Sequence, residues 1–140
     1  HRPVTLVFAR EKTKTSLKRS LQKGQTVVWF KKKLIGKKDF IVPLINSSLK
    51  VKSAKYFTNT TVAHVTISNN SDAPYTLRNQ SKYDFYNLTD LVMIPAHGEI
   101  NIDVRTIEKL RKFKLQFEVL SALTAPQTHP VIDFIIRVKQ

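Results

Sequence analysis

The side chains best suited to catalysis in this chain are four histidines, and their spacing does not form a metal site. They are His1, His64, His97 and His129. No two of them stand in the His-x-His or His-x-x-x-His spacing that brings two imidazoles to one metal ion. His64 lies in an alternating apolar stretch, which favours a place on a sheet face. His97 precedes a glycine and His129 a proline, which indicates a turn and a loop.

The other residue types that carry chemistry are absent or badly spaced. The chain has no cysteine, which excludes disulfides, thiolate zinc sites and a cysteine nucleophile. It has three glycines, far apart, and therefore no phosphate-binding loop. No serine has a Gly-x-Ser-x-Gly context, and no carboxylate pair is spaced for acid–base work. We therefore expect no catalytic, cofactor-binding or metal-ligating residue and no cofactor in this chain.

Aromatic residues alternate with polar ones in the segment Lys82-Tyr83-Asp84-Phe85-Tyr86-Asn87. Such rings beside a lysine could stack on sugars or bases. The alternative that we favour places Phe85 in a hydrophobic core and the two tyrosines at its rim. Trp29 stands in an apolar run and is expected in a core or at a domain interface.

The positive charge is concentrated in the first third of the chain. The 140 residues carry a net charge of +14, and residues 1–55 hold 15 of the 24 Lys and Arg with only two acidic residues. A basic face attracts polyanions such as nucleic acid. The alternatives are a solvated face or a face that packs on an acidic domain. We favour these two and do not expect nucleic acid as a partner.

The first third of the chain predicts a β-α-β-α arrangement. Apolar, β-branched runs indicate strands over 4–9 and 25–30. Leucines four residues apart indicate a helix between these strands, and a second helix is expected over 40–45, with Pro43 either near its start or kinking it. Lys31–Lys33 is expected to break the second strand.

The remainder of the chain predicts an immunoglobulin-like β-sandwich. After residue 48 the apolar residues alternate with polar ones, and turn residues separate about seven short strands, as in that class. The expected strands cover 49–55, 60–68, 74–79, 91–94, 100–104, 114–120 and 131–138. The fold class is therefore mainly β with a small α/β N-terminal piece. We predict a boundary between residues 1–47, the tail of a truncated α/β domain, and residues 48–140, an accessory sandwich.

The N-terminal segment resembles the end of a known domain family. The run His1–Ala9, the helix after it and the turn Lys23–Thr26 are similar to the close of the PHP (polymerase and histidinol phosphatase) domain. Leu34–Lys37 and Ala122–Pro126 resemble a bacterial PHP phosphoesterase group that carries an appended β-sandwich. In the turn, Gln25 stands where the family has arginine, which weakens a phosphate-contact role there.

This resemblance implies a longer parent protein that hydrolyses phosphoesters with divalent metals. In the family, His and Asp residues hold these metals, and those motifs would precede His1. No position here matches them, so no catalytic or metal residue is carried over. The chain begins with histidine rather than methionine, and we expect it to be part of a longer chain of bacterial origin. The compartment stays open, with the periplasm or secretion considered.

The first 47 residues cannot cover their own apolar faces. We therefore expect an upstream catalytic domain as a partner within one chain. In its absence, residues 1–47 would fold back on the sandwich or pack against a second copy of the chain. The apolar side chains involved would be Phe8, Leu17, Leu21, Val27, Val28 and Trp29.

Three functions follow from these observations. The first is a non-catalytic C-terminal accessory module that stabilises or shapes an upstream phosphoesterase domain. The second is a sandwich that binds carbohydrate or protein through its loops. The third is nucleic-acid binding through residues 1–55. No run approaches the roughly 18 apolar residues of a spanning helix, so no membrane segment is expected. Substrate and oligomeric state stay open.

Overall fold

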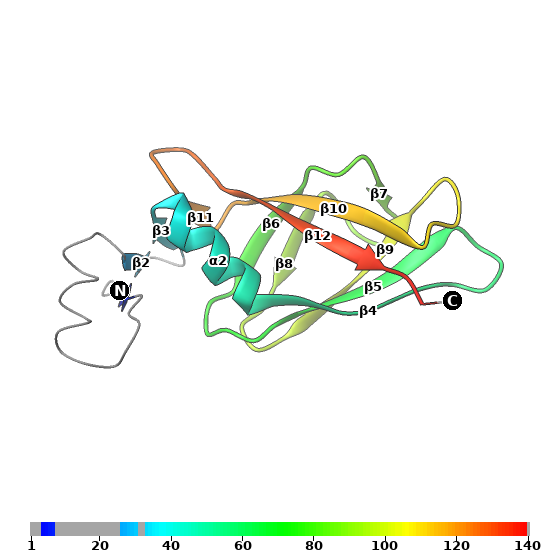
Figure 1. The fold of residues 1–140 in the computed structure, drawn as a ribbon, viewed down its shortest axis with the longest axis horizontal. Coiled ribbons are helices and arrows are strands. Elements are labelled where there is room, and N and C mark those ends of the chain that lie inside the picture. Colours follow the sequence, from blue (N-terminus) through cyan, green and yellow to red (C-terminus); the bar gives the residue numbers. More distant parts are fainter. Residues whose placement is uncertain (1–3, 8–25, 31–32, 140) are drawn as a thin grey trace.

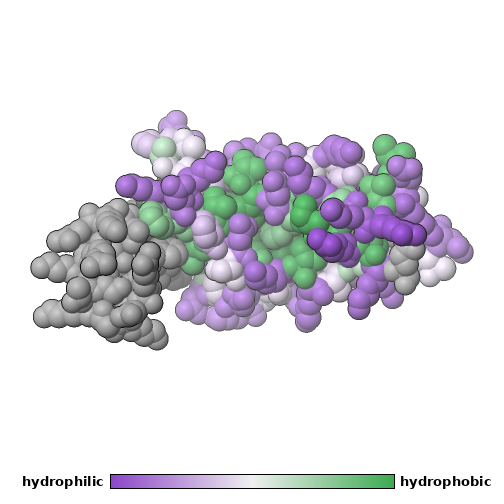
Figure 2. Space-filling view, in the orientation of Figure 1, coloured by the Kyte–Doolittle hydropathy of each residue, from purple (hydrophilic) through white to green (hydrophobic). Residues whose placement is uncertain are grey.

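Two sheets packed face to face form most of the molecule. The computed structural model describes the backbone of residues 4–7 and 26–30 and all of residues 33–139. In this part of the chain the molecule is elongated, with one helix and the N-terminal strands at one end and the C-terminus at the other (Figure 1). Polar side chains cover much of the face shown in Figure 2, with apolar surface between them.

Each sheet of the sandwich has four antiparallel strands among the described residues. Sheet I has the order β4 (Leu49–Tyr56), β5 (Val62–Asn69), β9 (Glu99–Arg105) and β7 (Asp84–Phe85). Sheet II has the order β12 (Val131–Arg137), β10 (Lys112–Val119), β6 (Tyr75–Asn79) and β8 (Leu91–Ile94). Strands such as β8, β10 and β12 alternate buried and more exposed positions, which explains the alternation of their sequences, whereas the central strand β5 has no exposed residue.

A third sheet lies at the N-terminal end of the sandwich. It contains β1 (Val4–Val7), β2 (Thr26–Phe30), β3 (Lys33–Gly36) and β11 (Ala122–Leu123), in that order. The first three strands pair antiparallel, whereas β11 pairs parallel with β3. One strand of this N-terminal sheet therefore comes from the C-terminal half of the chain.

The core lies between sheets I and II. Phe117 of β10 is fully buried, and its ring centroid lies 5.9 Å from that of Phe85 on sheet I and 5.8 Å from that of Phe134 on β12. Leu115 of β10 and the alternate residues Ile102 and Val104 of β9 are also fully buried. The period of two is therefore sufficient to build a continuous core from both inner faces.

Helix α2 (Lys38–Ser48) connects the N-terminal sheet to the sandwich. Ile41, Ile45 and Ser48 form its buried face, at the i, i+4, i+7 spacing of one helical face. Pro43 lies inside the helix rather than at its start. It is exposed, so the carbonyl that its missing N–H would bond can take water instead. The helix of the described part is too short and too polar to cross a membrane.

The predicted fold class is confirmed: the chain is mainly β, with an immunoglobulin-like sandwich. The seven strands expected after residue 48 are all present. The two-residue strands β7 and β11 were not predicted, because two residues show no alternation. The second strand ends at Phe30, as the lysine run predicted, whereas Lys33 begins a further strand, β3, that was not predicted. The predicted first helix, with Leu17 and Leu21, lies outside the described residues.

The central aromatic residue of the core gives a first prediction. Phe117→Ala should lower the free energy of unfolding by about 3–5 kcal/mol, because it removes a fully buried ring and leaves a cavity. The control is Met93→Ala on the outer face of sheet II, where the side chain is 71% exposed; it should change stability by less than about 0.5 kcal/mol. Urea unfolding followed by circular dichroism measures both, and equal effects would contradict this description of the core.

Candidate functional site

The contact between β3 and β11 joins the N-terminal sheet to the sandwich. The amide of Leu34 donates to the carbonyl of Ser121 at 2.8 Å, and Ala122 and Leu123 stand opposite Leu34 and Ile35 in the register. The side chains of Leu34 and Ala122 are 3% and 0% exposed. Apolar burial therefore accompanies the hydrogen bonds of this short parallel pair.

Ser121 also bonds to sheet II. Its hydroxyl accepts the amide N–H of Thr76 at 3.2 Å, while the amide of Leu120 donates to the carbonyl of Thr76 at 2.9 Å. On the far side of the pair, Nδ1 of His129 lies 2.8 Å from the carbonyl oxygen of Ala122; since that oxygen only accepts, Nδ1 carries the proton. We call the residues Leu34, Thr76, Ser121 and Ala122 the junction.

Tyr75 lies close to the junction and connects α2 with the sandwich. It is 2% exposed, and burial raises the pKa of its phenol above 10.0, while side-chain hydrogen bonds with Ser48 and Ser71 lower the pKa in part. Ser48 is the last residue of α2 and Ser71 lies in the turn after β5. The phenol is therefore buried beside the helix end and that turn.

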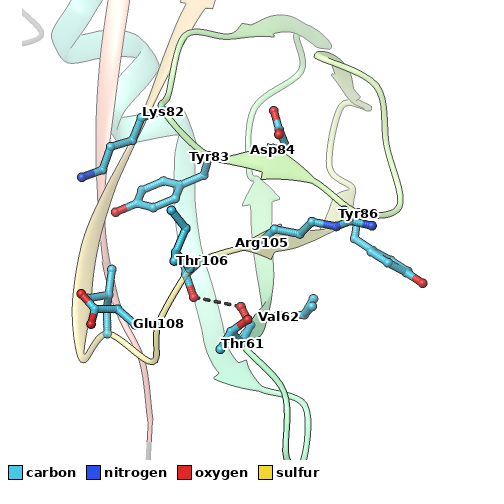
Figure 3. A pocket seen from close by; sticks show the side chains of 11 residues that line it. Thr61, Val62, Lys82, Tyr83, Asp84, Tyr86, Arg105, Thr106 and Glu108 are labelled. Atoms are coloured by element: carbon cyan, nitrogen blue, oxygen red, sulfur yellow. Dashed lines mark hydrogen bonds between the residues drawn. The ribbon is translucent and has the colours of Figure 1, made fainter.

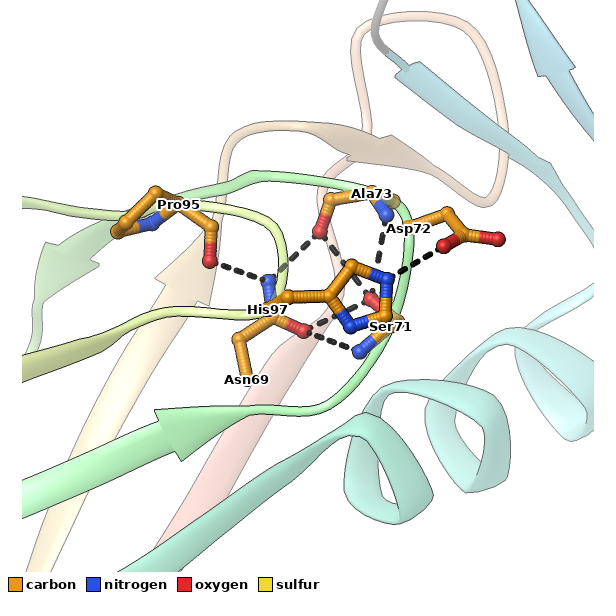
Figure 4. A network of polar contacts seen from close by, with 6 residues as sticks. All are labelled: Asn69, Ser71, Asp72, Ala73, Pro95 and His97. Carbon is orange, nitrogen blue, oxygen red and sulfur yellow. Dashed lines mark hydrogen bonds and ion pairs between the residues drawn. The ribbon is translucent and has the colours of Figure 1, made fainter.

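Asn69 fixes the turn that carries Ser71 (Figure 4). Its Nδ2 donates to the carbonyl oxygens of Ala73 and Pro95 at 2.7 and 3.1 Å, and its Oδ1 accepts the amide and hydroxyl of Ser71 at 3.0 and 2.7 Å. Asn69 is 2% exposed and fully bonded. A buried amide with all these partners holds two turns in one geometry.

His97 lies in the second of these turns, as predicted. Its φ is 54°, in the left-handed region, and its Nε2 lies 2.5 Å from Oδ1 of Asp72. A Cβ on the next residue, Gly98, would stand 2.5 Å from Cγ of Pro95, so this close approach requires glycine. His97 and Asp72 are largely exposed, and their contact closes the turn rather than forming a site.

A second feature lies at the opposite end of the sandwich, away from the N-terminal sheet (Figure 1). Here the β4–β5, β6–β7, β7–β8 and β9–β10 connections line an open cavity of about 640 Å³ (Figure 3). We call it the tip pocket. Its lining residues are Thr61, Val62, Lys82, Tyr83, Asp84, Tyr86, Arg105, Thr106, Ile107, Glu108 and Leu110.

The aromatic segment singled out in the sequence divides between the core and this pocket. Phe85 is buried, and Tyr83 packs edge-on against Phe113 with ring centroids 5.3 Å apart. Tyr86 is 63% exposed. The sequence missed Arg105–Leu110, the opposite side of the pocket, which is distant in the chain. The available signal was Ile107, an apolar residue inside a charged loop; it is 99% exposed.

The remaining histidine, His64, lies on the face of β5, as predicted. Its Nδ1 lies 2.6 Å from Oδ1 of Asp103 on β9, and its ring centroid lies 5.3 Å from that of Phe57. Within the described part of the chain, no three His, Asp or Glu side chains gather in a way that could hold a metal ion. His1 lies outside that part.

The described lysines of the basic region are exposed. Lys33, Lys37, Lys38, Lys50 and Lys52 all have solvent-accessible side chains, and Lys52 pairs with Glu99 at 3.1 Å. Trp29, expected in a core or at an interface, has only its backbone described, in β2 between Val4 and Leu34. The structure therefore does not test whether residues 1–47 pack on another domain.

Comparison with known proteins places this fold in a family. A family model described as an Ig-like domain, DUF5001, matches residues 49–135. The chain belongs to this family. The match begins at the first residue of β4 and covers most of the sandwich. No curated protein matches the chain.

One solved structure extends the similarity of this Ig-like chain to the N-terminal strands. It is a two-domain protein containing a predicted PHP-like metal-dependent phosphoesterase from Bacteroides vulgatus, with a TM-score of 0.82 and 19% identity. The similarity covers 97% of this chain and 39% of that one. The expected resemblance to part of a PHP-like protein is therefore confirmed at the level of the fold, and the chain spans well under half of its structural neighbour.

The buried phenol of Tyr75 gives a prediction on pH dependence. Its pKa is raised in the folded state, so the unfolded state loses its proton first as pH rises, and the free energy of unfolding falls above about pH 10. Tyr75→Phe should cost about 1 kcal/mol near pH 7 through its lost hydrogen bonds. The difference between wild type and variant should then shrink above about pH 10.

Chemical unfolding at a series of pH values measures this difference. Tyr86→Phe is the control, because that side chain is 63% exposed. The difference in unfolding free energy between wild type and Tyr86→Phe should stay the same as pH rises. A gap between wild type and Tyr75→Phe that stays constant through alkaline pH would contradict the burial of this phenol.

Proposed function

We propose that this chain is a non-catalytic accessory module of a PHP-like metal-dependent phosphoesterase. In this role the sandwich stabilises an upstream catalytic domain and fixes its closing strands. The structural neighbour supports the proposal, since it is a two-domain protein and this chain corresponds to 39% of its length. In this proposal, residues upstream of this chain would form the catalytic domain.

The observation that carries the proposal is the parallel pair β3–β11. A sandwich attached by a flexible linker would contribute no strand to the sheet of the neighbouring domain, and its orientation relative to that domain would vary. Here the strand β11 leaves the sandwich half of the chain and completes a sheet made by N-terminal residues. Burial of Leu34 and Ala122 makes this contact part of the core, which supports a fixed orientation of the two parts.

The divalent metals of a PHP-like reaction do not fit the residues that the structure describes in this chain. The described residues contain no group of three His, Asp or Glu side chains for a metal ion. His64 and His97 each contact one carboxylate, and these two pairs lie on different elements. We therefore assign metal binding and hydrolysis to the upstream domain, and assign this chain the positioning of that domain.

The test compares this chain with a protein that also carries the residues ahead of His1. Only the longer protein should hydrolyse p-nitrophenyl phosphate or its diester in the presence of Mn²⁺ or Zn²⁺. In the longer protein Leu34→Ala should lower the free energy of unfolding by about 2–5 kcal/mol. It should also reduce the rate of hydrolysis, because the junction no longer fixes the N-terminal sheet against the sandwich.

Met93→Ala on the outer face of sheet II is the matched control and should change neither property. Hydrolysis by the present chain in proportion to its concentration would overturn the non-catalytic role. Full hydrolysis by the destabilised Leu34→Ala protein, below its unfolding temperature, would overturn the role in positioning.

A further inference from the structure

The tip pocket lies at the end of the sandwich that the junction leaves free. Connections after β4, β6, β7 and β9 line it, and Figure 3 shows Lys82 and Tyr83 directed to one side of it and the Tyr86 ring to the other. Its volume, about 640 Å³, falls in the range of small-ligand sites. The accessory role proposed above makes no use of this end of the molecule.

The hydroxyl of the partly buried Tyr56 holds the loop after β9, which forms one wall of the pocket. Oη of Tyr56 accepts the amide N–H of Leu110 at 2.6 Å and donates to the carbonyl of the same residue at 2.9 Å. Oγ1 of Thr106 donates to the carbonyl of Thr61 at 2.9 Å, which ties this loop to the β4–β5 connection. Two hydroxyls therefore fix both ends of the loop that carries Ile107.

On the opposite wall, the side chain of Asn87 bonds to the backbone of β9 as a paired strand would. The amide of Tyr86 donates to the carbonyl of Asp103 at 2.6 Å. Oδ1 of Asn87 accepts the amide of Asp103 at 2.8 Å, and its Nδ2 donates to the carbonyl of Asn101 at 3.1 Å. These bonds continue the short pairing of β7 with β9 past the end of β7. The backbone that presents Tyr86 is therefore ordered before any ligand arrives.

Aromatic rings with a cation on one face line this pocket. The guanidinium carbon of Arg105 lies 4.6 Å from the ring centroid of Tyr86, and Nζ of Lys82 lies 5.3 Å from that of Tyr83. The guanidinium covers one face of the Tyr86 ring and holds its orientation. Because Tyr86 is 63% exposed, an apolar ligand face can stack on the remainder of its ring.

The charges of the lining exclude a strongly ionic ligand. Lys82 and Arg105 contribute two cations, and Asp84 and Glu108 contribute two carboxylates. The carboxylates would repel an anion and the basic groups would repel a cation, so neither gains a net electrostatic attraction from the lining. A neutral ligand with many hydroxyl groups can donate to the carboxylates and accept from the cations.

We propose that the tip pocket binds a neutral oligosaccharide. Sugar rings combine the two properties that the pocket requires: an apolar C–H face for Tyr86, and hydroxyl groups for Lys82, Arg105, Asp84 and Glu108. The fixed walls reduce the ordering cost of binding. This inference is independent of the accessory role, because it uses residues at the other end of the sandwich.

The test is a titration of the isotope-labelled chain, followed by amide chemical shifts. The probes are maltotetraose, cellotetraose, xylotetraose and mannotetraose, each to millimolar concentration, with a heparin tetrasaccharide as the anionic comparison. At least one neutral probe should shift the amides of residues 82–87 and 105–110. Tyr86→Ala should weaken that binding about tenfold, as expected for one lost aromatic contact.

Tyr86→Phe keeps the ring and should bind within about twofold of wild type, and Met93→Ala, on the outer face of sheet II, should bind as wild type. Circular dichroism identifies a variant that fails to fold. If Tyr86→Ala fails, the binding of Arg105→Gln, which should be weaker than wild type, is compared with that of Tyr86→Phe. No shift from any neutral probe, shifts confined to other surfaces, or tighter pocket binding by the heparin fragment would each overturn the proposal.

Discussion

Ser121 is the residue on which the arrangement of this molecule depends. Its carbonyl accepts the amide of Leu34 in the N-terminal sheet, and its hydroxyl accepts the amide of Thr76 in sheet II. It is 9% exposed, so these bonds form where water does not compete with them. Ala122 and Leu34 bury apolar surface beside them. The direction of the N-terminal sheet relative to the sandwich follows from this contact.

The two ends of the sandwich consequently have different properties. The junction end is tied by strand pairing, by the buried phenol of Tyr75 and by the bonded amide of Asn69. The tip end presents exposed apolar side chains, Tyr86 and Ile107, on loops whose backbones are fixed. This division fits a module that is attached to a protein at one end and available for a ligand at the other.

The sequence predicted the sandwich because its period of two is unbroken where both inner faces are buried, as in Lys114–Leu120. It did not predict β11, since a two-residue parallel strand shows no period and is created by its partner. The core position of Phe85 was predicted as the favoured alternative to ligand stacking by this aromatic segment, and Phe85 is buried. The tip pocket was not predicted: Tyr83 and Tyr86 stand in one short segment and were singled out, whereas Arg105–Leu110 joins them only through the pairing of β7 with β9.

The most direct test of the junction is native-state hydrogen exchange at the amide of Leu34, which donates to Ser121. If the N-terminal sheet and the sandwich form one cooperative unit, this amide should exchange with a free energy within about 1 kcal/mol of the slowest amides of β5 and β10. Fast exchange at Leu34 while those strands stay protected would show that the N-terminal sheet opens separately. That result would contradict the account of this chain as a rigidly joined module.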